Sequence, residues 1–194
     1  MVQAVPIQMP VEPQYVGLRL TADEYLRLPE DGFSYQLVHG VVLMSPKPSY
    51  EHQDVAGYLF AKMREFVAGR GLGKVLFEVD VQFAPDLVYA PDIVFYATSR
   101  VPARGAKIAT SPDLVVEFLS PATRSLDLKT KRDDYAAHGV GEYWAIDPIT
   151  LEAFCWKTSG TGFEQVSLVD SRLESTAIPG FVLDLADLRK YMQG

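Results

Sequence analysis

The residue that most strongly suggests chemistry in this chain is Glu117, a carboxylate that stands inside the apolar run 114–119. Such a run is typical of a central strand that is buried on both faces. Side chains alternate along a strand, so Glu117 has apolar neighbours on its own face as well as on the opposite one. Because burying an uncompensated ion is costly, we expect Glu117 to be protonated, paired with a cation or bound to a metal ion. A structural ion pair with a lysine or arginine is the simplest alternative to a functional role.

A second carboxylate, Asp92, opens another short apolar run, 92–96, which is entered through a proline. Proline fits the start of a strand because it cannot donate a hydrogen bond within a sheet. Asp92 therefore stands at the beginning of a strand that we expect to lie near the strand of Glu117. Two acids on neighbouring elements could hold Mg²⁺ through their oxygen atoms.

A helix predicted downstream of these strands adds a lysine to the two acids. Asp127, Lys131 and Tyr135 fall at positions i, i+4 and i+8, which share one face of a helix. Alone, Asp127 and Lys131 would form an exposed ion pair worth about 0.3 to 0.5 kcal/mol. Together with the two strand carboxylates, they suit metal-assisted phosphodiester hydrolysis. In that chemistry, a lysine orients the attacking water or meets the charge that develops on the phosphate.

The elements that must position these residues can be predicted from hydrophobic period and from helix and turn signals. The central order is helix 49–68, strand 74–83, strand 92–96, strand 113–119, helix 126–138 and strand 142–147.

Further elements are predicted on either side of this core. A capping box at Thr21 begins a short helix, and Gly40 lies in the turn of an N-terminal hairpin. After the core, the segments 151–156 and 162–169 predict an edge hairpin, and an amphipathic helix is expected over 183–191.

These features resemble a known family. A Pro-Asp followed by a buried acid and a nearby lysine resembles the signature of the restriction-endonuclease-like superfamily, Pro-Asp and then Asp/Glu-x-Lys. More closely, the segments 115–124 and 139–148 look like a large family of hypothetical bacterial restriction endonucleases. The resemblance extends from about residue 20 to the C-terminus. It implies an α/β fold with an αβββαβ core and a mixed central sheet, which here gains an N-terminal hairpin and a C-terminal hairpin plus helix.

The resemblance implies a metal-dependent endonuclease or phosphodiesterase that hydrolyses DNA, with Mg²⁺ or Mn²⁺ as its cofactor. Asp92 and Glu117 would be the metal ligands, and Lys131 would assist the nucleophile. The secondary candidates for this site are His52, Asp127 and Tyr135.

The chain departs from the family pattern at two positions. The signature lysine would stand two residues after the buried acid, where this chain has Leu119, so the lysine must come from the helix. Lys129 and Lys131 differ by about 200° in direction on a helix, so only one can face the acids. We expect Lys131 because it shares a face with Tyr135. The family often has a glutamate where this chain has Gln36, and no function is assigned to Gln36.

Length and composition favour one soluble globular domain. The 194 residues predict a loose N-terminal arm over 1–17 and a single domain over 18–194. No apolar run is long enough to span a membrane, and no signal peptide is evident. The single cysteine, Cys155, excludes an internal disulfide and suits the cytoplasm. The net charge of −7 is unusual for a protein that binds DNA through phosphate contacts.

Other hydrolase chemistries find no support in the sequence. His39, His52 and His138 do not form a His-Glu-x-x-His zinc motif, and no Gly-x-Ser-x-Gly elbow is present for serine hydrolysis. The alternative from another class is a catalytically inactive interaction protein with a nuclease fold, which would form a homodimer and use the polar cluster as a structural ion-pair network. Metal binding that requires both acids would distinguish the enzyme from this module.

Overall fold

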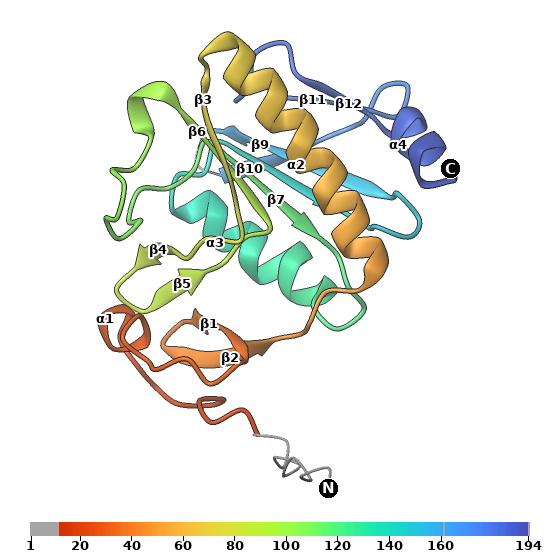
Figure 1. Cartoon of the computed structure of the whole chain (residues 1–194). Coiled ribbons are helices and arrows are strands. Elements are labelled where there is room, and N and C mark those ends of the chain that lie inside the picture. The colour runs from red at the N-terminus through yellow and green to blue at the C-terminus, as the bar shows by residue number, and fades with distance from the viewer. Residues whose placement is uncertain (1–11, 161, 194) are drawn as a thin grey trace, which may run out of the picture.

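A six-stranded mixed sheet forms the centre of the molecule (Figure 1). The structure is a computed structural model that describes residues 12–160 and 162–193. In spatial order the sheet consists of β10 (Gly162–Val166), β9 (Ala153–Ser159), β8 (Glu142–Ile146), β7 (Leu114–Phe118), β6 (Ile93–Ala97) and β3 (Gly73–Phe77). The β7–β8 pair is parallel, and the other neighbouring pairs are antiparallel. The predicted α/β class with a mixed central sheet is confirmed.

Helices cover both faces of this sheet (Figure 1). One face carries the long helix α2 (Tyr50–Arg70) and the C-terminal helix α4 (Leu185–Gln193). The opposite face carries the predicted helix 126–138, which begins as a π-helix, η2 (Leu126–Lys131), and continues as α3 (Arg132–Ala137). Both faces of the sheet are therefore buried, as the apolar run around Glu117 predicts.

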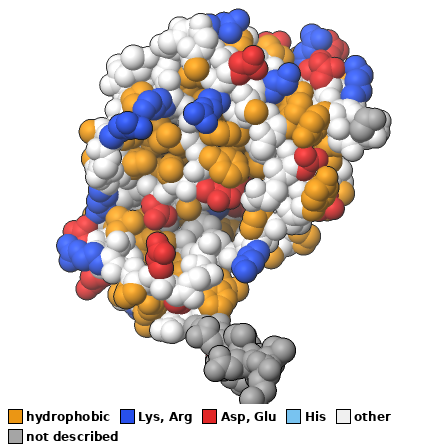
Figure 2. All heavy atoms as spheres, viewed as in Figure 1, with side chains coloured by type: hydrophobic (Ala, Val, Ile, Leu, Met, Phe, Trp, Pro, Cys, Tyr) orange, Lys and Arg blue, Asp and Glu red, His pale blue; other side chains and the backbone are white. Residues whose placement is uncertain are grey.

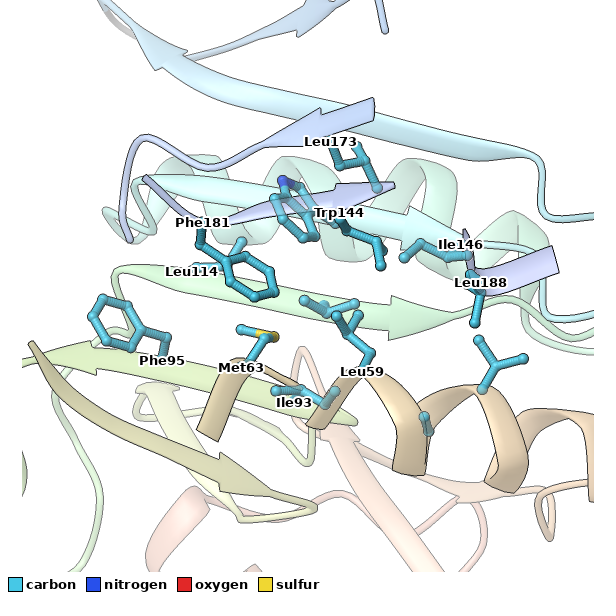
Figure 3. Packing of buried hydrophobic residues seen from close by; sticks show 14 of the residues in the cluster. Leu59, Met63, Ile93, Phe95, Leu114, Trp144, Ile146, Leu173, Phe181 and Leu188 are labelled. Atoms are coloured by element: carbon cyan, nitrogen blue, oxygen red, sulfur yellow. The ribbon is translucent and has the colours of Figure 1, made fainter. Parts of the chain in front are cut away.

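The core on the α2 side is made of aliphatic and aromatic side chains. Leu59 and Met63 of α2 point toward Ile93, Leu114 and Trp144 of the sheet (Figure 3), and all five are fully buried. Full burial of each such side chain contributes about 1.5 to 3 kcal/mol. This packing fixes the position of α2 relative to β6 and β7, the strands that carry or adjoin the two predicted acids.

A second, four-stranded sheet lies beside the central one (Figure 1). In spatial order it consists of β2 (Val41–Ser45), β1 (Ser34–Val38), β5 (Leu87–Tyr89) and β4 (Val81–Ala84). β1 and β2 form the predicted hairpin, with Gly40 at φ 78° in its turn. The short helix α1 (Ala22–Tyr25) begins at the capping box of Thr21 and packs on this sheet. Residues 1–11 of the predicted arm lie outside the described residues, so the arm stays a prediction.

The strand predicted over 74–83 is wrong in one respect, because the chain forms two strands that belong to different sheets. β3 ends at Phe77, Glu78 takes a left-handed backbone conformation at φ 46°, and β4 begins at Val81. Alternation of polar and apolar residues continues through this break, and neither glycine nor proline marks it. The crossing carries the chain into the second sheet, and β5 then returns it to Asp92 at the start of β6.

The C-terminal part contains the predicted edge hairpin, β9 and β10, and ends in α4. Between them lies a small two-stranded sheet of β11 (Arg172–Glu174) and β12 (Val182–Asp184) that the sequence analysis does not include. A single 3₁₀ turn, η1 (Thr98–Arg100), follows β6. Within the described residues, none of the helices combines the length and the apolar character needed to cross a membrane.

The buried carboxylate of Glu142 in β8 holds the segment 175–177 against the sheet through hydrogen bonds. Its Oε2 accepts hydrogen bonds from Ser175 Oγ and from the backbone N–H groups of Thr176 and Ala177, each at 2.9 Å. Its Oε1 accepts one from Trp144 Nε1 at 2.8 Å. The negative charge is thus stabilised by hydrogen bonds that converge on one fully buried side chain.

We expect Glu142→Gln to lower the free energy of unfolding by about 2 to 4 kcal/mol, because an amide nitrogen would face buried donors. The melting temperature should fall by roughly 5 to 15 °C for a domain of this size. Urea unfolding followed by circular dichroism measures the change. Glu174→Gln, on the exposed side of β11, is the matched control and should leave stability unchanged. Equal stability of the two variants would contradict the role given to Glu142.

Candidate active site

Glu117 lies near the end of β7 and is 4% exposed. One oxygen, Oε1, accepts a hydrogen bond from Lys131 Nζ at 2.9 Å and another from Tyr135 Oη at 2.6 Å. The other oxygen, Oε2, accepts no side-chain or backbone hydrogen bond from the described residues, although an ionised carboxylate can accept about four. Glu117 also lines the cleft between the two sheets. One oxygen of this carboxylate is therefore fixed by the protein, and the other is free to bind a ligand.

Asp92 is held beside Glu117 by the backbone of β7. Its Oδ2 accepts a hydrogen bond from the N–H group of Phe118 at 2.7 Å, and Phe118 follows Glu117 in the chain. Its Oδ1 lies 3.1 Å from Nε2 of His52, which stands in the first turn of α2. The start of β6, the end of β7 and the beginning of α2 therefore meet at this carboxylate.

Lys131 is buried between two carboxylates. Its side chain is 4% exposed, and Nζ lies 2.9 Å from Glu117 Oε1 and 3.0 Å from Asp127 Oδ1. The ammonium also lies 5.4 Å from the centre of the Tyr89 ring. Burial lowers the pKa of Lys131, but the Glu117 and Asp127 carboxylates outweigh it and raise this pKa above its ordinary value. The lysine is therefore charged at neutral pH.

The same surroundings perturb the carboxyl group of Glu117. Burial raises the pKa of Glu117, the charge of Lys131 lowers it, and the neighbouring carboxylates of Asp92 and Asp127 raise it, so that the net pKa is about 7. The direction is upward because one ammonium does not offset both the burial and two like charges. Glu117 and Asp127 contact Lys131, and Asp92 contacts His52, so three carboxylates lie close together and a further cation could relieve their mutual repulsion.

His52 links α2 to the acids. Burial lowers the pKa of its imidazole, whereas the hydrogen bond and charge of Asp92 raise it, and the net shift is upward. Its ring packs edge-on against Phe118 at 5.5 Å between centroids. His52 thus restricts the orientation of the Asp92 carboxylate, as outer residues often do around metal ligands.

The carboxylates fit a magnesium site of a particular kind. No group of three or more His, Cys, Asp and Glu side chains within residues 12–160 and 162–193 could enclose a metal ion. Mg²⁺ in phosphate-handling sites commonly needs only one or two carboxylates, with water and substrate phosphate supplying its other ligands. Asp92 and the free Oε2 of Glu117 match that donor set. They do not match a closed structural site made wholly of protein ligands.

The site opens into a cleft of about 850 Å³ between the central and second sheets. Its inner wall contains Asp92, Glu117, Asp127 and Lys131, and its outer wall is built by α1, β1 and the segments around them. Figure 2 shows a hollowed surface with acidic side chains between the two parts of the molecule. The reacting groups are therefore reachable from solvent through a recess and do not stand on an open surface.

The structure brings together all six residues singled out in the sequence, namely Asp92, Glu117, Lys131, His52, Asp127 and Tyr135. Their catalytic and metal-binding roles stay predictions. Of the two lysines considered, Lys131 faces Glu117 and Lys129 is exposed to solvent, as the shared helix face predicts.

Two residues beside the site, Tyr89 and Gln36, were given no role from the sequence. Tyr89 lies next to Lys131 and donates a 2.5 Å hydrogen bond to Asp134 Oδ2. Gln36 donates to Ser45 Oγ at 2.7 Å, while its buried Oε1 has no hydrogen-bond partner within the described residues. Tyr89 could have been noticed from its position just before the Pro-Asp segment. Gln36 could have been noticed because the family often has a glutamate at its position.

A mixed central sheet covered by helices on both faces defines a nuclease-like fold. Asp92 and Glu117 lie at the ends of two of its strands, and Lys131 reaches them from η2. A solved structure supports the fold: a protein described as a putative nuclease belonging to DUF820 from Anabaena variabilis matches with a TM-score of 0.76 and 23% sequence identity. The match covers 89% of this chain and 99% of that one.

The profile of the Uma2 family, described as "Putative restriction endonuclease", matches residues 22–186. This chain belongs to the Uma2 family, and membership supports a nuclease-like function. No protein among curated sequences matches the chain.

Proposed function

We propose that this protein hydrolyses phosphodiester bonds of DNA with the help of Mg²⁺ or Mn²⁺ bound by Asp92 and Glu117. The observation that carries the proposal is the difference in hydrogen bonding between the two carboxylate oxygens of Glu117. Its Oε1 is fixed by Lys131 and Tyr135, while its Oε2 has no hydrogen bond from the described residues. Asp92 accepts a hydrogen bond from the N–H group of Phe118, the residue that follows Glu117. By contrast with Glu117, both oxygens of Glu142, the carboxylate that holds the segment 175–177, accept hydrogen bonds from the protein.

In the proposed reaction, the oxygen of a water molecule forms a bond to phosphorus as the bond between phosphorus and the leaving oxygen breaks. A divalent ion would neutralise phosphate charge and lower the pKa of the attacking water. Lys131 is held in its charged form, so it acts as an orienting and charge-stabilising group and not as a base. His52 and Tyr135 keep the two carboxylates in place through their hydrogen bonds. The water gives its proton to solvent, and the leaving oxygen takes one up.

The direct test of this function is hydrolysis of labelled DNA by the purified protein in Mg²⁺, in Mn²⁺ and in EDTA. The substrates should include single strands, duplexes and plasmid, because neither sequence nor strand preference is assumed. We expect cleavage with either metal ion and none in EDTA. A protein that binds neither metal ion and cuts none of these substrates would contradict the proposal.

The assignment of the lysine gives a sharper prediction. Lys131→Met should lower the hydrolysis rate by at least about 100-fold, because it removes the only ammonium within hydrogen-bond distance of Glu117 among the described residues. Lys129→Met removes an exposed charge two residues away and should change the rate little. Rates should be compared well below each melting temperature, since Lys131→Met also leaves buried carboxylates without a cation. The reverse ranking of the two variants would refute the choice of Lys131.

A second function is favoured by one observation. The ammonium of Lys131 already has two carboxylate partners, Glu117 and Asp127, as expected for a structural ion-pair network. In that case the chain would be an inactive interaction module with a nuclease fold, assembled as a homodimer. The effect of metal ions on stability separates the two functions.

A further inference from the structure

The outer wall of the cleft is aromatic. Four rings from the N-terminal part line it, those of Tyr15, Tyr25, Phe33 and Tyr35. Two of the tyrosine hydroxyls donate hydrogen bonds within the protein. Tyr25 Oη donates to the carbonyl of Tyr35 at 2.7 Å, and Tyr35 Oη donates to Asp31 Oδ2 at 2.6 Å. The rings of Tyr15 and Tyr35 meet edge to face at 5.4 Å. These contacts hold Tyr15, Tyr25 and Tyr35 in a fixed arrangement in the cleft that the carboxylates also line.

Phe33 differs from the other three rings in its contacts. Its ring has no hydroxyl that could form a hydrogen bond, and its side chain is only half-buried. It belongs to none of the hydrophobic clusters that the described residues form. A half-buried phenylalanine that lines a cleft without packing into a core has a ring surface available to a ligand. A flat apolar partner would gain most from this surface.

The charges that line the cleft are unsuitable for a DNA duplex. Besides the acids of the site, five further carboxylates line it: Glu30, Asp31, Glu51, Glu78 and Asp80. The only lysines among the described residues that line the cleft are Lys47 and Lys131. Lys131 is already paired with two carboxylates. Proteins that bind a duplex through its backbone typically make about 6 to 10 phosphate contacts with lysine and arginine. One free lysine in this cleft cannot supply that number.

The size of the cleft leads to the same conclusion. Its volume of about 850 Å³ lies within the range of small-molecule sites, roughly 300 to 1,000 Å³. Specific duplex binders instead bury about 1,000 to 2,500 Å² of positively charged protein surface. The cleft is therefore suited to one or a few nucleotides, in which bases can stack on aromatic rings.

We propose that the cleft takes unpaired nucleotides of a single-stranded nucleic acid, with a base stacked on Phe33 and the adjoining phosphodiester at Asp92 and Glu117. This inference rests on the proposed function and specifies its substrate class. Stacking tolerates any base because every base has a π-face. Lys47 is the one lining lysine that is not paired with a carboxylate among the described residues, so phosphate contacts contribute little to this binding. Binding should consequently depend only weakly on salt.

The test is the binding of labelled 12-nucleotide single-stranded DNA, RNA of the same sequence and a DNA duplex, measured by fluorescence anisotropy in Ca²⁺. Wild-type protein should bind a single strand at least about tenfold more tightly than the duplex. With one phosphate contact from Lys47, the plot of log K against log salt should have a slope near about −0.7, against about −5 to −9 for a duplex binder. The DNA and RNA arms show which sugar the cleft accepts.

Variants of Phe33 identify the stacking surface. Phe33→Ala should weaken single-strand binding by about 5- to 150-fold, and Phe33→Trp should retain it. Phe33→Leu keeps apolar volume without an aromatic face, so it should also bind weakly even though it preserves folding. Phe163→Ala is the matched control: Phe163 is a half-buried phenylalanine of β10, outside the cleft, and its loss should leave binding unchanged.

Tighter binding of the duplex, or wild-type single-strand binding by Phe33→Ala and Phe33→Leu, would overturn this inference. The outcomes also separate it from the proposed function. Metal-dependent cleavage that prefers duplex DNA and is unaffected at Phe33 would leave the hydrolase in place and refute the substrate class. Single-strand binding that requires Phe33, with no hydrolysis in any metal ion, would support the cleft assignment and refute the hydrolase.

Discussion

Asp92→Asn and Glu117→Gln should each lower the rate of metal-dependent DNA hydrolysis by at least about 10³-fold, if the two carboxylates hold the divalent ion. Each substitution replaces one charged ligand oxygen with a neutral amide of nearly the same shape. The Asp92 carboxylate accepts a hydrogen bond from Phe118 N–H and Glu117 accepts two at Oε1, and an amide oxygen can still accept these bonds. The fold should therefore survive while the affinity for metal ions is lost.

The measurement is the initial rate of cleavage of a DNA substrate that the wild type cuts, at several concentrations of Mn²⁺. Matched controls are Asp133→Asn and Glu65→Gln, which neutralise exposed carboxylates of α3 and α2 that do not line the cleft. These should retain the wild-type rate. A correctly folded Asp92→Asn or Glu117→Gln protein that cuts as well as wild type would show that the catalytic site lies elsewhere.

The core of the candidate site could be predicted from sequence because each part depends on local rules. An acid inside an apolar run must be compensated, so Glu117 is conspicuous. Residues four apart on a helix are neighbours, so Asp127 and Lys131 meet. η2 is a π-helix with a wider turn than an α-helix, yet this contact survives at 3.0 Å. The choice of Lys131 over Lys129 as the lysine that faces Glu117 depended on the helix face that Lys131 shares with Tyr135, and the structure places its Nζ 2.9 Å from Glu117 Oε1.

The second sheet could not be predicted because it depends on contacts between distant segments. β1 and β2 were predictable as a hairpin, but their sheet is completed by β4 and β5, about 40 residues later in the chain. The break at Glu78 that sends the chain between sheets has no glycine or proline to mark it. The cleft, its aromatic wall and the location of Gln36 all follow from that sheet, so this part of the site was missed.

Saturating Mn²⁺ should raise the melting temperature of the wild-type protein by about 5 to 10 °C. A ligand that binds only the folded state, at about 100 times its dissociation constant, adds roughly 2.7 kcal/mol to the free energy of unfolding. Each kcal/mol shifts the melting temperature of a domain of this size by about 2 to 4 °C. The expected rise has a direct physical cause, since the ion would relieve repulsion between Asp92 and Glu117. Glu117→Gln should remove most of it.

The same variant without metal tests the structural alternative. Glu117→Gln removes one of three like charges, and Lys131 keeps Asp127 at 3.0 Å, so no buried ammonium is left without a carboxylate. The metal-free variant should therefore melt no lower than metal-free wild type. Lys131→Met is the contrasting variant, because it leaves Glu117 and Asp127 buried without their cation and should cost about 3 to 5 kcal/mol.

Differential scanning fluorimetry of wild type, Glu117→Gln and Lys131→Met, each with EDTA and with Mn²⁺, gives all of these comparisons in one experiment. In the structural alternative, Asp127 alone would not compensate Lys131 for the loss of Glu117, and Glu117→Gln would lose about 3 to 5 kcal/mol, as Lys131→Met does. Its melting temperature would then fall by roughly 6 to 20 °C. That fall, with no effect of Mn²⁺ on wild type, would decide for the interaction module. A Glu117→Gln protein as stable as wild type, with a Mn²⁺ response confined to wild type, would decide for the metal-dependent hydrolase.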